Sequence, residues 1–219
     1  MCASRLLRRS GMAFALVAEA IGWKADSVYQ VGVGNYHEEI DVLVEEYPEI
    51  KVFGCDPCPV DKTYQGEFHQ VAISNYVGEA PFYLKHRHRD GSSLHKLPDA
   101  QLRKEIVAKV TTLDALWPDP VGKHILLWLD CESSELAALQ GGENFIKRVE
   151  MINVEMTAKP NGPGWVRPVD IHRHLLERGF IRQWIHTFRI PDAQMDCIYV
   201  RNFLFKPEYC CDPIGYPLL

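Results

Sequence analysis

The sequence predicts an α/β fold built on a single doubly wound, mostly parallel sheet that ends in a C-terminal antiparallel hairpin. Strand-like apolar runs alternate with helix-like segments, and this alternation favours parallel strands joined by right-handed crossovers. The clearest strand is Ile125–Leu129, which is apolar without a break, as a strand buried on both faces must be. Two last runs, Phe180–Ile190 and Asp196–Phe205, are separated by a Pro-Asp turn and indicate the hairpin.

Length and composition favour one soluble domain. The chain has 219 residues, which we divide into an N-terminal helical segment (1–26), a sheet core (27–205) and a tail (206–219). Hydrophobic residues make up 47% and charged residues 24%, the balance of an ordinary soluble enzyme. The net charge of −5 provides no basic field for nucleic acid, and no apolar run approaches a membrane span. Neither nucleic acid nor a membrane is therefore expected as a partner.

The cysteines and the N-terminus bear on the compartment. Seven scattered cysteines, an odd number, do not form a disulfide framework, which favours a reducing, cytoplasmic location. Three arginines precede the run MAFALVAEA, and Ala18–Ala20 resembles a signal-peptidase site, so an N-terminal signal or transit segment is the alternative. The run is short and contains Glu19, which favours an amphipathic helix packed on the sheet.

The elements follow in order from turn signals and hydrophobic periodicity. The first half is expected to contain a helix over 12–23, a strand over Ser27–Val33, a helix over 36–46, strands over Ile50–Cys55 and His69–Ser74, and a short added strand over Ala80–Leu84. The second half is expected to contain a basic loop over Lys85–Lys96, an extended stretch over Glu105–Val110, a short helix before Pro118, the strand Ile125–Leu129, a helix started by Ser133 and Ser134, a strand over Val149–Glu155, a loop over Thr157–Pro168 and a helix to Arg178.

Acidic residues gather where the strand Ile125–Leu129 ends. Asp130 follows it directly, and Glu132 and Glu135 come within the next turn. Open α/β sheets bind ligands in the crevice at the carboxyl ends of their strands, so these acids indicate a site. The structural alternative is that Asp130 only caps the next helix and Glu132 only suits its dipole.

A glycine turn and an acid suggest a nucleoside cofactor. Gly32 and Gly34 lie between a strand and a helix, and Asp56 follows Gly32 by 24 residues at the next strand end, where an acid can hold ribose hydroxyls. The third glycine of the dinucleotide fingerprint is replaced by His37, and no phosphate-binding Gly-Lys-Ser/Thr follows. A cofactor with a ribose and no phosphate fits, and S-adenosylmethionine is one. A nicotinamide-dependent oxidoreductase is the weaker alternative.

At this point the sequence resembles the FkbM-type family of S-adenosylmethionine-dependent methyltransferases, over about residues 27–201. The matching pieces occur in the family's order: Gly32-Val33-Gly34-Asn35, Phe53–Pro57, Val71–Asn75 with Gly78, Ser92–Leu94, Thr112–Asp114, Leu127–Glu135, Val154-Glu155 and Gly179-Phe180. Each piece is common, but their order is specific.

The resemblance implies a class I methyltransferase fold, Rossmann-like, that usually transfers a methyl group to a hydroxyl oxygen. It implies these cofactor contacts: Gly32, Gly34 and Asp56 to the methionine and ribose parts, Ile73 and Ser74 beside the adenine, Asp130 near the reacting methyl, and Gln30 where the family carries a first-strand acid. The chain departs from the pattern at Gln30 for that acid, Tyr36 for the last glycine of the first motif, and Trp128 and Ser133 for the Lys and Gly of the fourth-strand block. A catalytically impaired binding or regulatory module is therefore the competing function.

Transfer to a hydroxyl requires an aligned acceptor and a base for its proton. Asp130 is the first candidate base and Glu132 the second. If the strands of Asp130 and Glu155 are neighbours, these carboxyls lie roughly 5 Å apart and could share a divalent cation. The alternative is that the two acids help to bind the cationic sulfonium, so a metal is possible but not favoured. The acceptor is expected to be a small molecule or glycan, and the sequence leaves the acceptor and the oligomeric state open.

Overall fold

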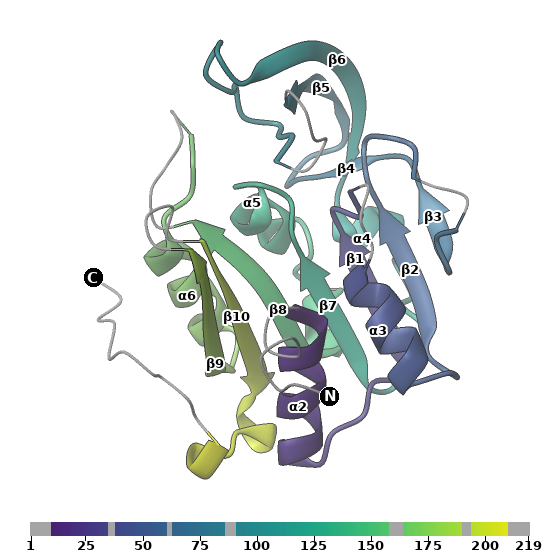
Figure 1. The fold of residues 1–219 in the computed structure, drawn as a ribbon, viewed down its shortest axis with the longest axis vertical. Coiled ribbons are helices and arrows are strands. Elements are labelled where there is room, and N and C mark those ends of the chain that lie inside the picture. The colour runs from purple at the N-terminus through teal and green to yellow at the C-terminus, as the bar shows by residue number, and fades with distance from the viewer. Residues whose placement is uncertain are drawn as a thin grey trace.

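The computed structural model describes residues 10–34, 38–60, 63–85, 91–157, 164–189 and 194–209 (Figure 1). Within these residues, seven strands form the main sheet in the order β3-β2-β1-β7-β8-β10-β9. The strands are β1 (Ser27–Val31), β2 (Lys51–Cys55), β3 (Glu67–His69), β7 (Ile125–Leu129), β8 (Val149–Thr157), β9 (Phe180–Arg189) and β10 (Gln194–Arg201). The five strands from β3 to β8 pair in parallel, which confirms the predicted fold class.

The C-terminal hairpin is confirmed, and its second strand lies inside the sheet. β10 pairs antiparallel with β8 on one side and with β9 on the other. Its side chains from Met195 to Val200 are all buried, so the strand requires a neighbour on both edges. This insertion brings Asp196 of β10 directly opposite Glu155 of β8.

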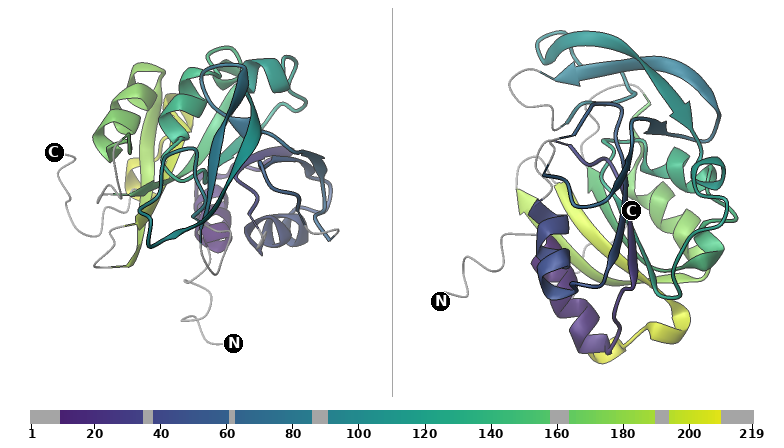
Figure 2. Two further views of the ribbon diagram at one scale, coloured as in Figure 1. Left: turned by 90° about the horizontal axis from the view of Figure 1, so that it is seen from above. Right: turned by 90° about the vertical axis from the view of Figure 1, so that its right-hand side faces the viewer.

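Helices cover both faces of the main sheet, as a doubly wound fold requires (Figure 2). The helices are α2 (Ser10–Ile21), α3 (Glu38–Glu46), α4 (Leu113–Leu116), α5 (Glu135–Gln140) and α6 (Pro168–Glu177). α2 and α3 share one apolar core with Leu126 and Trp128 of β7. α4, α5 and α6 pack in the other core with Leu127 and Leu129. All five residues of β7 are buried, as their unbroken apolar run predicted.

The predicted strand over His69–Ser74 is wrong as a single element. The chain pairs with β2 only as β3, then leaves the main sheet, and Ala72 and Ile73 form β4 of a second sheet. The amide of Val71 donates to the carbonyl of His69 at 3.0 Å, and this tight three-residue turn redirects the chain between the two sheets.

The second sheet has the order β4-β6-β5 and lies beyond the carboxyl ends of the main strands (Figure 1). Its strands are β4 (Ala72–Ile73), β5 (Gly78–Lys85) and β6 (Leu102–Thr111). The predicted short strand over Ala80–Leu84 and extended stretch over Glu105–Val110 are its antiparallel pair, β5 and β6. This sheet therefore adds a cap above the edge at which a ligand site was expected.

Three short 3₁₀ turns complete the described elements: η1 (Ile146–Arg148), η2 (Asn202–Leu204) and η3 (Pro207–Tyr209). The last predicted strand therefore ends at Arg201 and not at Phe205. Of the two expected helix starters, Ser133 lies in the preceding turn, and Ser134 is the N-cap residue of α5, which begins at Glu135 without a side-chain capping hydrogen bond. Among the described residues, no helix is long and apolar enough to span a membrane.

Candidate active site

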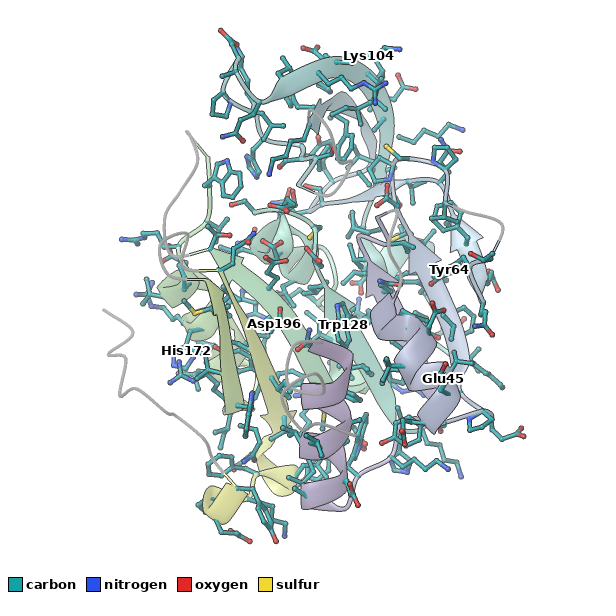
Figure 3. The ribbon with its side chains drawn as sticks, in the orientation of Figure 1. Glu45, Tyr64, Lys104, Trp128, His172 and Asp196 are labelled. Carbon is teal, nitrogen blue, oxygen red and sulfur yellow. The ribbon has the colours of Figure 1, made fainter. Side chains whose placement is uncertain are left out.

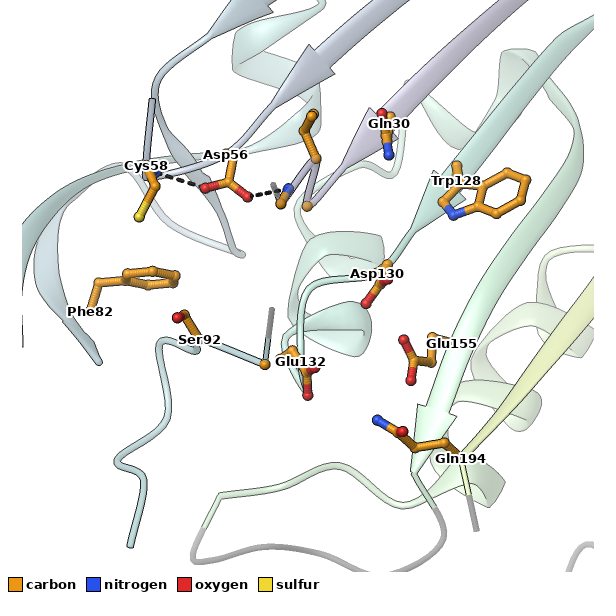
Figure 4. A pocket seen from close by; sticks show the side chains of 14 residues that line it. Gln30, Asp56, Cys58, Phe82, Ser92, Trp128, Asp130, Glu132, Glu155 and Gln194 are labelled. Carbon is orange, nitrogen blue, oxygen red and sulfur yellow. Dashed lines mark hydrogen bonds between the residues drawn. The ribbon is translucent and has the colours of Figure 1, made fainter. Parts of the chain in front are cut away.

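A cavity of about 340 Å³ lies at the carboxyl ends of the central strands, below the second sheet (Figure 4). Its described lining residues are Gln30, Gly32, Val33, Gly34, Asp56, Cys58, Phe82, Gly91, Ser92, Trp128, Asp130, Glu132, Glu155 and Gln194. A smaller and more apolar cavity of about 40 Å³ adjoins it and is lined by Val71, Ala72, Ile73 and Leu94 among others. The two cavities share Gly32, Asp56, Phe82, Ser92 and Asp130.

The structure brings most of the predicted site residues together. The main cavity is lined by Gln30, Gly32, Gly34, Asp56, Asp130, Glu132 and Glu155. Ile73 lines the smaller cavity, whereas Ser74 is buried beyond the end of β4, lines neither cavity, and donates its amide to the carbonyl of Thr111. Tyr36 and His37, which the sequence interpretation used, lie outside the described residues.

Gly32 is needed for a reason that the sequence interpretation did not give. Its φ is +85°, and a Cβ built on it would lie 1.6 Å from the backbone oxygen of Asp130. The ends of β1 and β7 therefore approach each other too closely for any side chain at this position. The glycine therefore allows the short distance between the β1 loop and Asp130.

Asp56 ties the end of β2 to the glycine loop. One carboxylate oxygen accepts from the amide of Gly34 at 3.0 Å, and the other accepts from the amide of Cys58 at 2.7 Å (Figure 4). Each oxygen of an ionised carboxylate can accept more than one hydrogen bond. Asp56 can therefore hold the loop in place and still receive hydroxyl donors from a ligand in either cavity.

Asp130 and Glu155 are neighbours, as the sequence predicted for adjacent strands. β7 and β8 pair in parallel with Leu129 opposite Val154, so the next residue of each strand lies side by side. Burial, followed by the negative charge of Asp130 and a hydrogen bond between the two carboxyl groups, raises the pKa of Glu155 well above its usual range. Glu155 thus retains its proton at a pH where an ordinary carboxyl has lost it.

The sequence left a divalent cation at Asp130 and Glu155 possible but not favoured, and the structure adds no support for one. Among the residues that the structure describes, no group of three or more His, Cys, Asp or Glu side chains is arranged to hold a metal ion. Among the described residues, Cys55, Cys58, Cys131 and Cys197 form no disulfide bond.

Sequence reasoning missed several residues around the cavity. Asp196 adds a negative charge beside Glu155, and it lies on the same face of the sheet as Trp128 (Figure 3). Gln194 lines the cavity because β10 lies next to β8. Phe82 lines both cavities from β5, a strand that had only been expected as an addition to the sheet. These contacts depend on strand order and on the second sheet, which no local sequence signal specifies.

Three of the four positions that depart from the family pattern, Gln30, Trp128 and Ser133, lie within the described residues. Gln30 and Trp128 are in register on β1 and β7, and both line the floor of the main cavity. The hydroxyl of Tyr64 donates to the side-chain oxygen of Gln30 at 3.4 Å. Ser133 stands where the family has glycine, and its φ of +78° is the left-handed conformation that glycine adopts without strain.

The comparison with known families agrees with this geometry. The family model of the methyltransferase FkbM domain matches residues 25–182, which is most of the chain. The chain belongs to the FkbM family of S-adenosylmethionine-dependent methyltransferases. The resemblance inferred from the ordered motifs is therefore confirmed, and the seven-stranded sheet is that of a class I methyltransferase. No curated protein matches the chain.

Solved structures with similar folds are distant in sequence. The plantazolicin methyltransferase BpumL in complex with SAH is 9% identical, with a TM-score of 0.46 over 91% of this chain and 84% of that one. The 1,6-didemethyltoxoflavin-N1-methyltransferase of Burkholderia thailandensis is 11% identical, with a TM-score of 0.47 over 88% and 79%. The magnesium protoporphyrin IX methyltransferase of Synechocystis PCC 6803, with bound SAM, is 12% identical, with a TM-score of 0.41 over 86% and 79%.

Proposed function

We propose that the chain transfers the methyl group of S-adenosylmethionine to a hydroxyl oxygen of a small molecule or glycan. The observation that carries this proposal is the pairing of Asp130 with Glu155 on a cavity that also receives the glycine loop and Asp56. A carboxylate beside a protonated neighbour supplies a base for a hydroxyl proton. Asp56, which follows β2, and Asp130, which follows β7, line the same cavity, so cofactor and acceptor can meet there.

The residues present fit the cofactor. Two polar features, the positive-φ loop at Gly32 and Gly34 and the carboxylate of Asp56, suit the methionine and ribose parts. The small cavity, with Ile73 and Phe82 on its walls, suits a flat aromatic ring such as adenine, and Ser74 is proposed to support that wall from behind. When bound, S-adenosylmethionine supplies a methyl group on a positively charged sulfur.

The chain's own part in the reaction is alignment and proton removal. Asp130 accepts the proton of the acceptor's hydroxyl group while the hydroxyl oxygen of the acceptor takes the methyl group. Glu155 keeps its own proton and orients the carboxylate of Asp130 through their hydrogen bond. Glu132 lines the same cavity and is the second candidate base.

Polar side chains that line only the main cavity support a hydroxylated acceptor. Gln194 and Glu132 line this cavity and do not line the small apolar one. Carboxamides and carboxylates donate to and accept from hydroxyl groups, which small polar molecules and glycans both carry.

Calorimetric titration tests the cofactor. We expect S-adenosylmethionine and S-adenosylhomocysteine to bind and NAD not to bind. Asp56→Ala should abolish binding, whereas Asp56→Asn keeps one acceptor oxygen and should weaken it less. The matched control is Asp119→Asn, an exposed acid away from both cavities. A preference for NAD would contradict the proposal.

A measurement of methyl transfer distinguishes an active enzyme from a catalytically impaired binding module. The module is the competing function because Gln30 stands where the family carries an acid. Release of S-adenosylhomocysteine is measured with a library of hydroxylated small molecules and glycans. Asp130→Asn should lower kcat by at least about a hundredfold while leaving cofactor affinity within a few fold, because a general base acts on the chemical step. Tight cofactor binding without transfer to any acceptor would favour the module.

A further inference from the structure

The turn that follows β7 holds an unusual backbone conformation. Glu132 and Ser133 both have positive φ, at +49° and +78°, although neither is a glycine. Left-handed backbone at such residues is strained and persists only where the surrounding structure determines it. The turn, Cys131–Ser134, directly follows Asp130 and includes Glu132, so its conformation sets where both candidate bases enter the cavity.

Glu135 makes the contacts that hold this turn from within. Its Oε1 accepts from the amide of Cys131 at 3.0 Å and from the amide of Ser133 at 3.2 Å. One carboxylate oxygen therefore bridges the residues on either side of Glu132. The side chain of Glu135 is only 3% exposed, so these two hydrogen bonds are formed away from competing water.

Two other segments are attached to the outside of the same turn. The hydroxyl of Ser93, below the second sheet, donates to the carbonyl of Glu132 at 2.7 Å. The hydroxyl of Ser133 accepts from the amide of Val166, just before α6, at 2.7 Å. These contacts come from loops, whereas Glu135 is the first residue of a helix packed on the sheet.

The placement of a carboxyl here needs an explanation beyond packing. Glu135 shares a small internal cavity with Glu132 and Glu155, and the Cys131 thiol also lies against it. An apolar side chain would avoid the cost of burying a carboxyl beside other acids. A carboxyl group can accept hydrogen bonds from the backbone amides of Cys131 and Ser133, whereas an apolar side chain cannot.

We infer that Glu135 is a positioning residue of this active site, whose buried carboxyl oxygen holds the Cys131–Ser134 turn in the conformation that presents Asp130 and Glu132 to the cavity. This inference deepens the proposed methyl transfer and rests on it for its functional meaning. Glu135 lines neither of the two larger cavities, so it acts through the turn and not on the ligand.

Amide hydrogen exchange, resolved to single residues by NMR, tests the inference without any ligand. Glu135→Ala removes the acceptor, and Glu135→Asp withdraws it by one methylene, whereas Glu135→Gln keeps an acceptor oxygen in place. In the Ala and Asp variants, exchange of the Cys131 and Ser133 amides should accelerate at least about tenfold, with the β7 amides unchanged. The Gln variant should exchange like the wild type.

The matched control is Asp114→Ala. One carboxylate oxygen of Asp114 likewise accepts from two backbone amides, those of Asn144 and Phe145, in a turn that lines neither of the larger cavities. This variant should accelerate exchange at those two amides and leave the 131–134 turn and the affinity for S-adenosylhomocysteine unchanged.

The inference is overturned if the Gln variant exchanges as fast as the Asp variant, or if acceleration spreads equally over β7 and β8. The first result would mean that charge or packing matters, and the second that Glu135 supports the fold in general. The comparison of amide exchange rates between Glu135→Asp and Glu135→Gln still tests the inference if Glu135→Ala does not fold. Affinity for S-adenosylhomocysteine is measured alongside, and it should fall at least about fivefold in Glu135→Asp and recover in Glu135→Gln. If the wild type does not bind S-adenosylhomocysteine, the proposed function fails while the exchange result still stands.

Discussion

At the scale of single residues, the clearest conflict between side chain and backbone is at Ser133. Its left-handed φ suits glycine, but its hydroxyl anchors the segment before α6 through the amide of Val166. At this position, the strain of the left-handed backbone is offset by a tertiary hydrogen bond. The two contributions are separable, because glycine removes both the strain and the hydroxyl whereas alanine removes only the hydroxyl.

Ser133→Gly should be more stable than Ser133→Ala by about 1 kcal/mol, since only glycine relieves the left-handed strain. Urea unfolding of the two variants, monitored by tryptophan fluorescence, measures the difference. Equal stability would mean that the turn relaxes out of the left-handed region when the hydroxyl is lost.

Gly32→Ala should destabilise the fold by more than about 3 kcal/mol, because it adds a left-handed alanine and a clash with the Asp130 carbonyl. Gly22→Ala is the matched control: its φ is +70°, and a Cβ there meets nothing within 4 Å. That variant should lose only about 1–2 kcal/mol, the cost of the conformation alone. Thermal unfolding compares them, and similar losses would show that β1 and β7 can move apart.

The pH dependence of stability should contain a contribution from the raised pKa of Glu135. Burial raises its pKa in the folded protein from the ordinary value of 4.5 to about 7. Between those pH values the unfolded chain releases this proton more readily than the folded one, so stability falls as pH rises, by up to about 3 kcal/mol. Glu135→Gln should remove this part of the fall between pH 4.5 and pH 7. Urea unfolding across that range checks it, and parallel curves for the two proteins would contradict it.

At the scale of elements, patterns within one strand were predictable and choices between strands were not. The unbroken apolar run of β7 specified a doubly buried strand, and its terminal acid specified the cavity edge. The proximity of Asp130 and Glu155 was predictable, because parallel pairing of their two strands was the natural expectation. The division of residues 69–74 between two sheets, and the insertion of β10, depend on distant partners. Gln194 and Asp196 were missed for that reason.

Arg201 at the end of β10 secures this insertion. Its guanidinium donates to the carbonyls of Ile146, Val149 and Arg178, and it lies 4.1 Å from the ring centre of Phe180. A lysine cannot reach three acceptors in these directions, so Arg201→Lys should cost about 2 kcal/mol of stability. Arg148→Lys, which changes one exposed hydrogen bond to Gly122, should stay within about 0.5 kcal/mol. Chemical denaturation of both variants tests this, and equal losses would contradict it.

At the scale of the whole molecule, residues of both sheets line the paired cavities. Phe82 and Ser92 come from the second sheet and its loop, and Gly32, Asp56 and Asp130 come from the main one. A ligand that fills both cavities would therefore contact both sheets at once. The family and the general fold could be predicted from the ordered motifs, whereas this shared wall required the arrangement in space.

A crystal structure of the protein with bound S-adenosylhomocysteine tests the central claim most directly. The account predicts ribose hydroxyls on Asp56, the adenine in the small cavity beside Ile73 and Phe82, and the sulfur directed toward Asp130. It is contradicted if the ligand lies outside these cavities, or if its sulfur is directed away from Asp130 and Glu155.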